Sequence, residues 1–368
     1  MKILHVTKKY PSALGGDAVV VSNLQKQQVA AGHNVAIVTS NCDEIKNGKH
    51  IYKIGLRDTA AKLDTITFKR LISLLILFFR MFGIIRTERP DIIHTHSVDM
   101  AFFVSFAARW HGVPIVHTFH IVTFYDAEQS ALRRKSELWL AKNAKPRLVT
   151  APNTYDVKRL NAAGLTQTRL LPNGVDVLAW EPRGYTERNH IFTFLAVGRL
   201  ESQKGYEYLV KAAALLATAP TSFHVLIVGE GSQKTALQEL VRTLRLQGVV
   251  TLIGRKRQEE IRTLLAEANA AVLPSLYETT PLTLLEAWSA TTPVIATRVG
   301  ILRDVQDDFN AAYVVPPKNE ELLMTAMSSA MSDHARRLRI AANGHEEAKK
   351  YAWPIVTKEA EALYETAL

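Results

Sequence analysis

The sequence predicts an α/β protein with two doubly wound, Rossmann-like domains that face a central cleft. Short runs of β-branched and other apolar residues alternate with helical patterns, which is typical of parallel sheets with crossover helices. The runs fall into two series, at residues 3–7, 35–39, 91–94, 114–118 and 147–151, and then at 191–197, 223–228, 249–253, 270–273, 293–297 and 312–315. Because such sheets bind ligands at the carboxyl ends of their strands, we expect both domains to share one site.

Chain length supports this division. At ~150 residues per domain, a chain of 368 residues corresponds to two domains and a tail. We predict an N-terminal domain over residues 1–172, a second domain over 173–345 and a C-terminal helical segment over 346–368. The hinge lies near residues 171–176, before a polar stretch that contains Pro and Gly at 181–189. The final segment, which is interrupted at Pro354, has no following strand and needs another surface to pack on.

The composition indicates a globular protein of a reducing compartment. Hydrophobic residues make up 47% of the chain, and its single cysteine forms neither an internal disulfide nor a Cys-x-x-Cys site. The first apolar run is too short for a signal peptide, and the apolar segment 71–85 is shorter than the ~20 residues of a spanning helix. We therefore expect a cytoplasmic protein. Segment 71–85 follows two basic residues and reads either as a buried crossover helix or as a helix lying on a membrane.

Charge is distributed unevenly between the two halves. Residues 1–175 contain 24 Lys and Arg against 12 Asp and Glu, whereas residues 176–368 contain 21 against 23. A basic first half suggests an anionic partner, which by charge alone is a membrane surface, a phosphorylated acceptor or a nucleic acid.

Several familiar motifs are absent from the sequence. No Gly-x-Gly-x-x-Gly follows a strand and no Walker A sequence occurs, which argues against hydride transfer and kinase chemistry. No Asp-x-Asp pair follows a strand, and the carboxylates at Asp304, Asp307 and Asp308 read as a loop. His94 and His96 face the same way on a strand, but no third metal ligand is evident. We therefore expect no required metal.

The strongest motif covers residues 273–287. A strand ends near Leu273, and we predict Thr280 as the N-cap and Pro281 as the first residue of the following helix. The N–H groups of Leu282 and Thr283 would then point outward from the positive end of the helix, which suits a pyrophosphate.

Two carboxylates flank that helix start. Glu278 precedes the helix and Glu286 lies about two turns away, so they can contact different parts of one ligand. Carboxylates that accept from vicinal hydroxyls suit a sugar or a ribose. The alternative is a capped helix with one exposed Glu.

A second motif, at residues 196–205, follows directly on a strand. Arg199 and Lys204 can both reach one phosphate group from this turn, and charge-assisted bonds of this kind contribute ~1.5 to 3 kcal/mol each. They would stabilise a leaving diphosphate without a metal. The alternative is a pair of solvated surface cations.

Together these motifs resemble a known family. Its features here are Glu-x7-Glu at Glu278 and Glu286, Gly-Arg-Leu-x3-Lys-Gly at 198–205, Leu-Pro-Asn-Gly-Val-Asp at 171–176, and the glycine-containing runs at 226–231 and 251–254. The chain is similar to the retaining nucleotide-sugar glycosyltransferases with the GT-B fold, the glycogen-synthase-like family 4. The resemblance spans nearly the whole chain and includes Gly15-Gly16 and a final helix with Trp353, which in the family crosses back to the N-terminal domain.

The resemblance implies a role for each matching residue of the donor site. Arg199 and Lys204 would bind the donor diphosphate, together with the helix start at Thr280, Leu282 and Thr283. Glu286 would bind the ribose hydroxyls, and Glu278 would hold hydroxyls of the transferred sugar.

Three further positions complete the implied site. The backbone around Gly254 and Arg255 would meet the nucleobase, and Gly16 would let the first domain approach the phosphates. His120 matches the active-site histidine and would give polar support to the reacting centre, since no carboxylate matches a covalent nucleophile.

The resemblance implies a retaining, metal-independent hexosyltransferase without a cofactor, whose co-substrate is a UDP- or GDP-sugar. Its acceptor would be a glycan or a lipid-linked molecule in cell-envelope glycan, polysaccharide or glycolipid synthesis. Because the first half is basic, we expect a peripheral contact with an anionic membrane on the cytoplasmic face, and no nucleic acid.

Departures from the family pattern affect the sugar pocket. Thr279 stands where Gly usually follows Glu278, Gly300-Ile301 replaces a Gly-Gly turn, and Asp304 stands where Glu is usual. These changes leave the donor sugar open. The alternatives are a GT-B nucleotide-sugar epimerase, a phosphorylase, or a non-catalytic basic module that binds membrane or nucleic acid.

Overall fold

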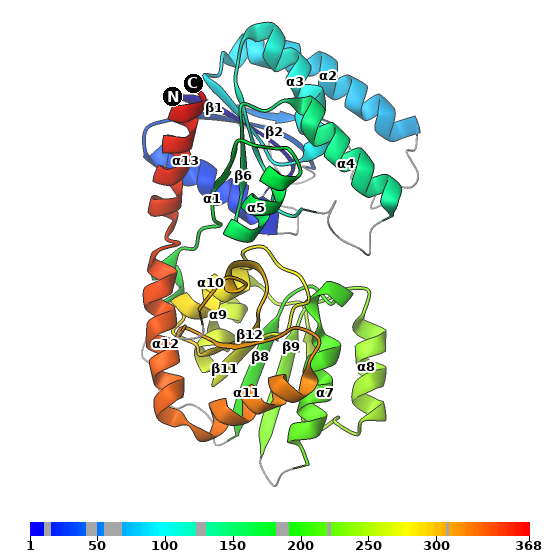
Figure 1. Cartoon of the computed structure of the whole chain (residues 1–368), viewed down its shortest axis with the longest axis vertical. Coiled ribbons are helices and arrows are strands. Elements are labelled where there is room, and N and C mark those ends of the chain that lie inside the picture. Colours follow the sequence, from blue (N-terminus) through cyan, green and yellow to red (C-terminus); the bar gives the residue numbers. More distant parts are fainter. Residues whose placement is uncertain are drawn as a thin grey trace. The chain divides into compact units, whose positions relative to one another are not determined.

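A computed structural model describes residues 1–10, 16–41, 50–54, 68–122, 130–181, 191–218, 222–306 and 309–368 (Figure 1). Gly15, Asp307, Asp308 and nearly all of the polar stretch 181–189 lie outside the described residues. The chain divides into two compact units, the first formed by Met1–Asn173 with Trp353–Leu368 and the second by Gly174–Ala352. Each is a parallel α/β sheet covered by helices, so the prediction of two Rossmann-like domains is confirmed.

The described part of the first unit contains a seven-stranded parallel sheet in the order β3-β2-β1-β4-β5-β6-β7. The strands are β1 (Lys2–Lys9), β2 (Asn34–Asn41), β3 (Ile51–Lys53), β4 (Ile92–Thr95), β5 (Ile115–Thr118), β6 (Leu148–Ala151) and β7 (Thr168–Leu170). Strands β4, β5 and β6 are buried along their whole length, as expected for central strands covered on both faces. The short strands β3 and β7 were not predicted, because three residues carry too little pattern.

The helices of the first unit are α1 (Gly16–Ala30), α2 (Phe68–Glu88), α3 (Val98–His111), α4 (Ala131–Ala144), α5 (Thr154–Ala162) and α13 (Trp353–Ala367). Helix α3 packs between α2 and α4, while α13 packs against α1 (Figure 1). Local capping defines several helix starts: the Asn153 side chain, for example, accepts from the backbone N–H of Asp156. Among the described helices, none combines the length and apolarity needed to cross a bilayer.

The second unit has a six-stranded parallel sheet in the order β10-β9-β8-β11-β12-β13 within the described residues. Its strands are β8 (Phe192–Val197), β9 (Phe223–Val228), β10 (Val250–Gly254), β11 (Ala270–Leu273), β12 (Val294–Thr297) and β13 (Tyr313–Val315). Its helical segments are α6 (Val177–Trp180), η2 (Ser202–Lys204), α7 (Tyr206–Leu216), α8 (Lys234–Thr243), α9 (Gln258–Glu267), α10 (Leu282–Ser289), η3 (Gly300–Leu302), α11 (Glu320–Ser332) and α12 (His334–Lys349). Separate apolar clusters cover the two faces of this sheet.

The C-terminal segment differs from the predicted single, interrupted helix. Helix α12 ends at Lys349, and α13 begins at Trp353 with Pro354 in its first turn. Proline is tolerated there because the first N–H groups of a helix have no intrahelical acceptor. Pro354 therefore starts a new helix. The sequence placed the return to the first unit at residue 346, whereas α12 stays with the second unit and the return begins at Trp353.

Candidate functional site

Three loops at the carboxyl ends of strands in the second unit are joined by backbone hydrogen bonds. The loop after β11 meets the loop after β8, where the N–H of Leu276 donates to the carbonyl of Gln203 at 2.8 Å. It also meets the loop after β12, where the N–H of Ile301 donates to the carbonyl of Thr279 at 2.9 Å. The two sequence motifs are therefore parts of one rim.

Two glycines allow these loops to approach closely. Gly205 has φ +64°, and a Cβ there would lie 2.1 Å from the carbonyl oxygen of Pro274. Gly300 has φ +58°, and a Cβ there would lie 2.1 Å from the carbonyl oxygen of Thr279. Any side chain at either position would force the loops apart.

The ammonium group of Lys204 forms an ion pair with Oε1 of Glu278, which also accepts a hydrogen bond from Ser275 Oγ at 3.0 Å. The side chains of Lys204 and Glu278 are only 18% and 12% exposed, so solvent screens this pair weakly. The sequence did not anticipate this pairing. Arg199, the second cation of the expected clamp, is exposed on the same loop.

Helix α10 starts one residue later than the sequence predicted. Pro281, with φ −67° and ψ 124°, is the N-cap, and Leu282 is the first helical residue. The prediction of Thr280 as N-cap was wrong, because the extended ψ of Pro281 keeps Pro281 outside the helix. As the N-cap, Pro281 accepts at its carbonyl from the N–H of Leu284 at 3.0 Å. The N–H groups of Leu282 and Thr283 still precede the first intrahelical bond, so they stay the candidate donors to an anion.

Glu286 lies in the second turn of α10 and is partly buried. Burial raises the pKa of its carboxyl group to about 7, and the charge of Arg262 opposes this shift. A carboxylate in such surroundings gains from hydroxyl donors that replace water.

The residues expected to meet the nucleobase, Gly254 and Arg255, lie where β10 ends. Gly254 has φ +72°, and its carbonyl accepts from the N–H of Gly229 at 2.9 Å. Arg255, the next residue, is exposed. The backbone at Gly254 is thus tied to the loop after β9.

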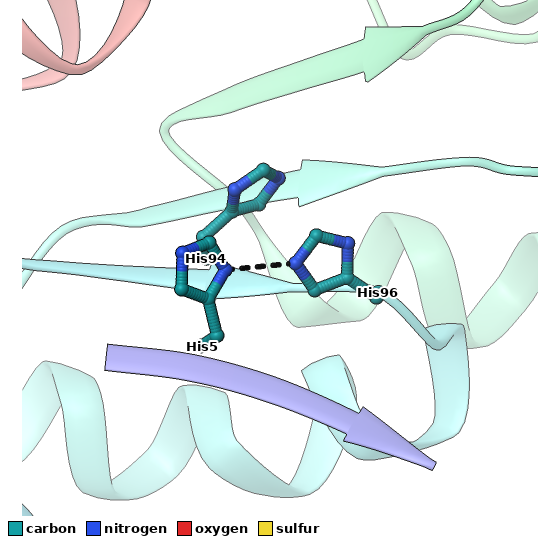
Figure 2. A group of neighbouring side chains, drawn as sticks. All are labelled: His5, His94 and His96. Carbon is teal, nitrogen blue, oxygen red and sulfur yellow. Dashed lines mark hydrogen bonds between the residues drawn. The ribbon is translucent and has the colours of Figure 1, made fainter. Parts of the chain in front are cut away.

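In the first unit, four histidines gather at strands β1, β4 and β5. His5, His94 and His96 are buried, and Figure 2 shows their rings close together, with a hydrogen bond between His5 Nδ1 and His96 Nε2 of 3.0 Å. His96 Nδ1 is in turn 3.0 Å from Nε2 of His120. Strand register brings the group together, since His5 and His94 are direct partners between β1 and β4.

Burial determines the charge of these histidines. It lowers the pKa of His5 to about 4 and holds the pKa values of His94 and His96 well below the usual range, with neighbouring histidines adding to the shift of the last two. Burial also lowers the pKa of His120, against the charge of Asp17. All four are therefore neutral near pH 7.

His5 supplies the third imidazole that the sequence did not show beside His94 and His96. Its ligand atom and theirs lie within 4.8 Å of one another. However, all six ring nitrogens already have hydrogen-bond partners, which are Gln28, Tyr364, Thr118, His120 and each other. A metal ion would have to displace these bonds.

The structure thus collects the predicted residues in two groups. Arg199, Lys204, Glu278, Glu286 and the α10 start share one rim of the second unit. The first unit holds His120 in the histidine cluster and Gly16, which is exposed at the start of α1.

Sequence reasoning missed Gln28 and Tyr364, which complete the cluster from α1 and α13. It also missed Glu137 on α4, whose pKa burial raises to about 7. Nothing local in the sequence marked these residues, because hydrogen bonds between distant elements leave no local pattern.

Comparison with known proteins finds a matching family for each half of the chain. Residues 14–177 match the family described as Glycosyltransferase Family 4, and residues 183–347 match Glycosyl transferases group 1. A glycogen synthase of Mycobacterium tuberculosis is 28% identical over 373 residues, which cover 93% of this chain and 89% of that one.

Solved structures show the same fold. Sucrose-phosphate synthase from Thermosynechococcus elongatus superposes with a TM-score of 0.83 at 23% identity, over 99% of this chain and 98% of that one. Anabaena HepE, solved in complex with UDP-glucose, gives a TM-score of 0.77 at 18% identity, over 99% and 100% of the two chains.

Proposed function

Since this chain belongs to the GT-B glycosyltransferases of family 4, which use nucleotide-sugar donors, we propose that it moves a hexosyl unit from a UDP- or GDP-sugar to an acceptor hydroxyl with retention. The observation that carries the proposal is the partly buried Lys204–Glu278 pair on the same rim as the α10 start. A cation, a sugar-binding carboxylate and two outward N–H groups are the parts that a departing sugar diphosphate needs.

The diphosphate is the leaving group in this proposal. The bond between the anomeric carbon and the phosphate oxygen breaks, and its electron pair stays on that oxygen. Arg199, Lys204 and the N–H groups of Leu282 and Thr283 stabilise the added charge. The acceptor oxygen forms its bond on the same face and passes its proton to the departing phosphate oxygen, so no protein base and no metal are required.

Two carboxyl groups orient the donor. Glu278, held by Lys204 and Ser275, accepts from hydroxyls of the sugar, and Glu286 accepts from the ribose hydroxyls. Gly254 and Arg255 are proposed to meet the base. The UDP-glucose complex of HepE favours a uridine nucleotide.

The proposal is tested by assaying nucleotide release with a panel of nucleotide sugars and acceptors. Glu278→Gln should abolish turnover with nearly unchanged nucleotide affinity, and Arg199→Ala should weaken donor binding or turnover at least about tenfold. Glu239→Gln, at an exposed ion pair on α8, is the matched control and should behave as wild type. Activity should survive chelation.

Wild-type activity in both Glu278→Gln and Arg199→Ala would refute the assignment. Product without an acceptor would indicate an epimerase, and a requirement for inorganic phosphate would indicate a phosphorylase. A basic binding module would tolerate the loss of Glu278.

We further propose that the acceptor is carried by an anionic membrane and that helices α2, α3 and α4 meet the lipid. Phe79, Trp110 and Leu132 are 70%, 79% and 74% exposed, one on each of these helices. Aromatic contacts link the helices, with ring centroids of Phe82 and Trp110 at 6.4 Å and of Phe102 and Trp139 at 5.4 Å.

Basic residues accompany these exposed side chains. Arg109 lies 5.0 Å above the ring of Phe106, and Lys135 shares one face of α4 with Leu132 and Trp139. Exposed aromatic residues with flanking cations suit the boundary between headgroups and acyl chains. This surface supports a lipid-linked acceptor in cell-envelope glycan or glycolipid synthesis, reached from the cytoplasmic face.

A further inference from the structure

Gln28 lies where two buried hydrogen-bond chains meet. Its Oε1 is 2.8 Å from Nε2 of His5, and its Nε2 donates to the hydroxyl of Tyr364 at 3.1 Å. The side chain of Gln28 is fully buried, so no water competes for either end. One end of an amide only accepts hydrogen bonds and the other only donates them. The orientation of the Gln28 amide therefore decides which atom donates in each hydrogen bond of both chains.

The first chain runs from Gln28 to His120. The amide oxygen can only accept, so His5 carries its proton on Nε2 and, being neutral, offers a lone pair at Nδ1. His96 Nε2 must then donate to His5 Nδ1, which leaves His96 Nδ1 to accept from His120 Nε2. All three histidines therefore carry the proton on Nε2.

The second chain runs from Gln28 to Thr150. The hydroxyl of Tyr364 accepts from the amide N–H and donates to His94 Nδ1 at 2.7 Å. His94 then carries its proton on Nε2 and donates to Thr118 Oγ1 at 2.6 Å, and Thr118 donates to Thr150 Oγ1 at 2.6 Å. Reversing the amide of Gln28 would reverse every bond in both chains.

We infer that Gln28 is a positioning residue whose amide sets one common tautomer, with the proton on Nε2, in His5, His94, His96 and His120. This tautomer gives the His120 ring an N–H at Nε2 and a lone pair at Nδ1, and the part of His120 at the reacting centre rests on the proposed function. Tyr364 belongs to α13, so the C-terminal helix helps hold the amide in place.

Burial explains why the effect extends over several residues. In water, both tautomers of a neutral imidazole are populated because solvent satisfies either nitrogen. Inside the cluster, a histidine with the opposite tautomer would set two N–H groups or two lone pairs against each other, at the cost of an unsatisfied buried group.

The direct test is a long-range ¹H–¹⁵N correlation spectrum of the whole protein labelled with ¹⁵N-histidine, which reports the tautomer of each ring. The four cluster histidines should all show the Nε2–H pattern. In Gln28→Glu an ionised carboxylate accepts from both neighbours, so Tyr364 donates to it and only His94 should change, to Nδ1–H. In Gln28→Met the common tautomer should be lost.

Two results in the wild-type spectrum would overturn the inference. One is a mixture of tautomers among the four histidines. The other is stoichiometric binding of added Zn²⁺ with loss of the cluster signals, which would identify a metal site instead.

Kinetics test the effect on His120 separately. Gln28→Met should lower kcat about tenfold and leave the KM for the donor unchanged, as expected for a group that acts through another. Gln28→Glu, which retains an acceptor for His5, should restore most of kcat. As the control, Thr168→Val removes a buried hydrogen bond to the carbonyl of Leu165, outside both chains, and should leave kcat unchanged.

A kcat of Gln28→Met within about twofold of wild type would refute the positioning role. The spectra need no activity. If no nucleotide sugar is turned over, the proposed function fails while the tautomers still decide the inference about Gln28.

Discussion

The ammonium group of Lys204 is paired with the carboxylate of Glu278, which lies 74 residues further along the chain. The pair connects the loop after β8 with the loop after β11, beside the close approach of Gly205 to Pro274. Both side chains are therefore held in place before any donor binds. Such preorganisation reduces the reorganisation needed when charge develops on a leaving group.

Removing the cation from this pair should weaken nucleotide binding. Lys204→Met deletes the proposed phosphate partner and leaves the partly buried Glu278 carboxylate unpaired, so affinity for the nucleoside diphosphate should fall at least about tenfold. Calorimetric titration measures this, with Lys349→Met, at an exposed pair on α12, as the control. Equal affinities in wild type and Lys204→Met would place the diphosphate elsewhere.

Nucleotide affinity should rise with pH through about 7, the pKa to which burial raises Glu286. The native pKa of Glu286 lies above the ordinary value of 4.5 for a glutamate. Between these two values the native state without ligand holds more protons than the unfolded chain, so its stability falls as pH rises across that window. Ribose hydroxyls donate best to the ionised carboxylate, so binding should release a proton. Calorimetric titrations in buffers with different ionisation enthalpies measure how many protons are released on binding.

Glu286→Gln is the control for the pH dependence. The variant should bind nucleotide more weakly and lose the contribution centred near pH 7. A pH profile identical to that of wild type would mean that Glu286 does not contact the ligand.

Gly205→Ala should destabilise the protein more than Gly112→Ala. Both glycines have left-handed backbone, with φ +64° and +69°, but a Cβ at Gly112 meets nothing within 4 Å. The backbone strain costs about 1 kcal/mol at either site, and the clash with Pro274 should add about 2 kcal/mol at Gly205. Denaturant unfolding gives both values, and equal losses would contradict the close approach of the two loops.

Membrane binding should depend on the exposed apolar residues of α2, α3 and α4. Leu132→Ser should reduce co-sedimentation with vesicles that contain anionic phospholipid, because it removes apolar area from the surface that we propose meets the lipid. Leu178→Ser is a matched control, since Leu178 is 79% exposed in the second unit against 74% for Leu132. Equal binding by both variants would exclude this surface.

Much of the fold could be predicted because its signals are local. Apolar β-branched runs marked β1, β2 and β4 to β6, and the glycine-containing motifs marked the loops that now form one rim. The errors were also local in origin. Thr280 is a favourable N-cap by residue type, but Pro281 takes that place because its backbone stays extended. Pro354 looked like an interruption, although it stands in the first turn of α13.

By itself, the sequence determined the two α/β units, the family and the motifs that form one rim of the second unit, because periodicity and motif spacing act over a few residues. Tertiary structure alone decided which of those residues meet. Strand register placed His5 against His94, and packing of α1 and α13 brought Gln28 and Tyr364 to the cluster. The closing of two loops likewise paired Lys204 with Glu278. Such contacts depend on how buried surfaces fit over long chain separations, which no local pattern records.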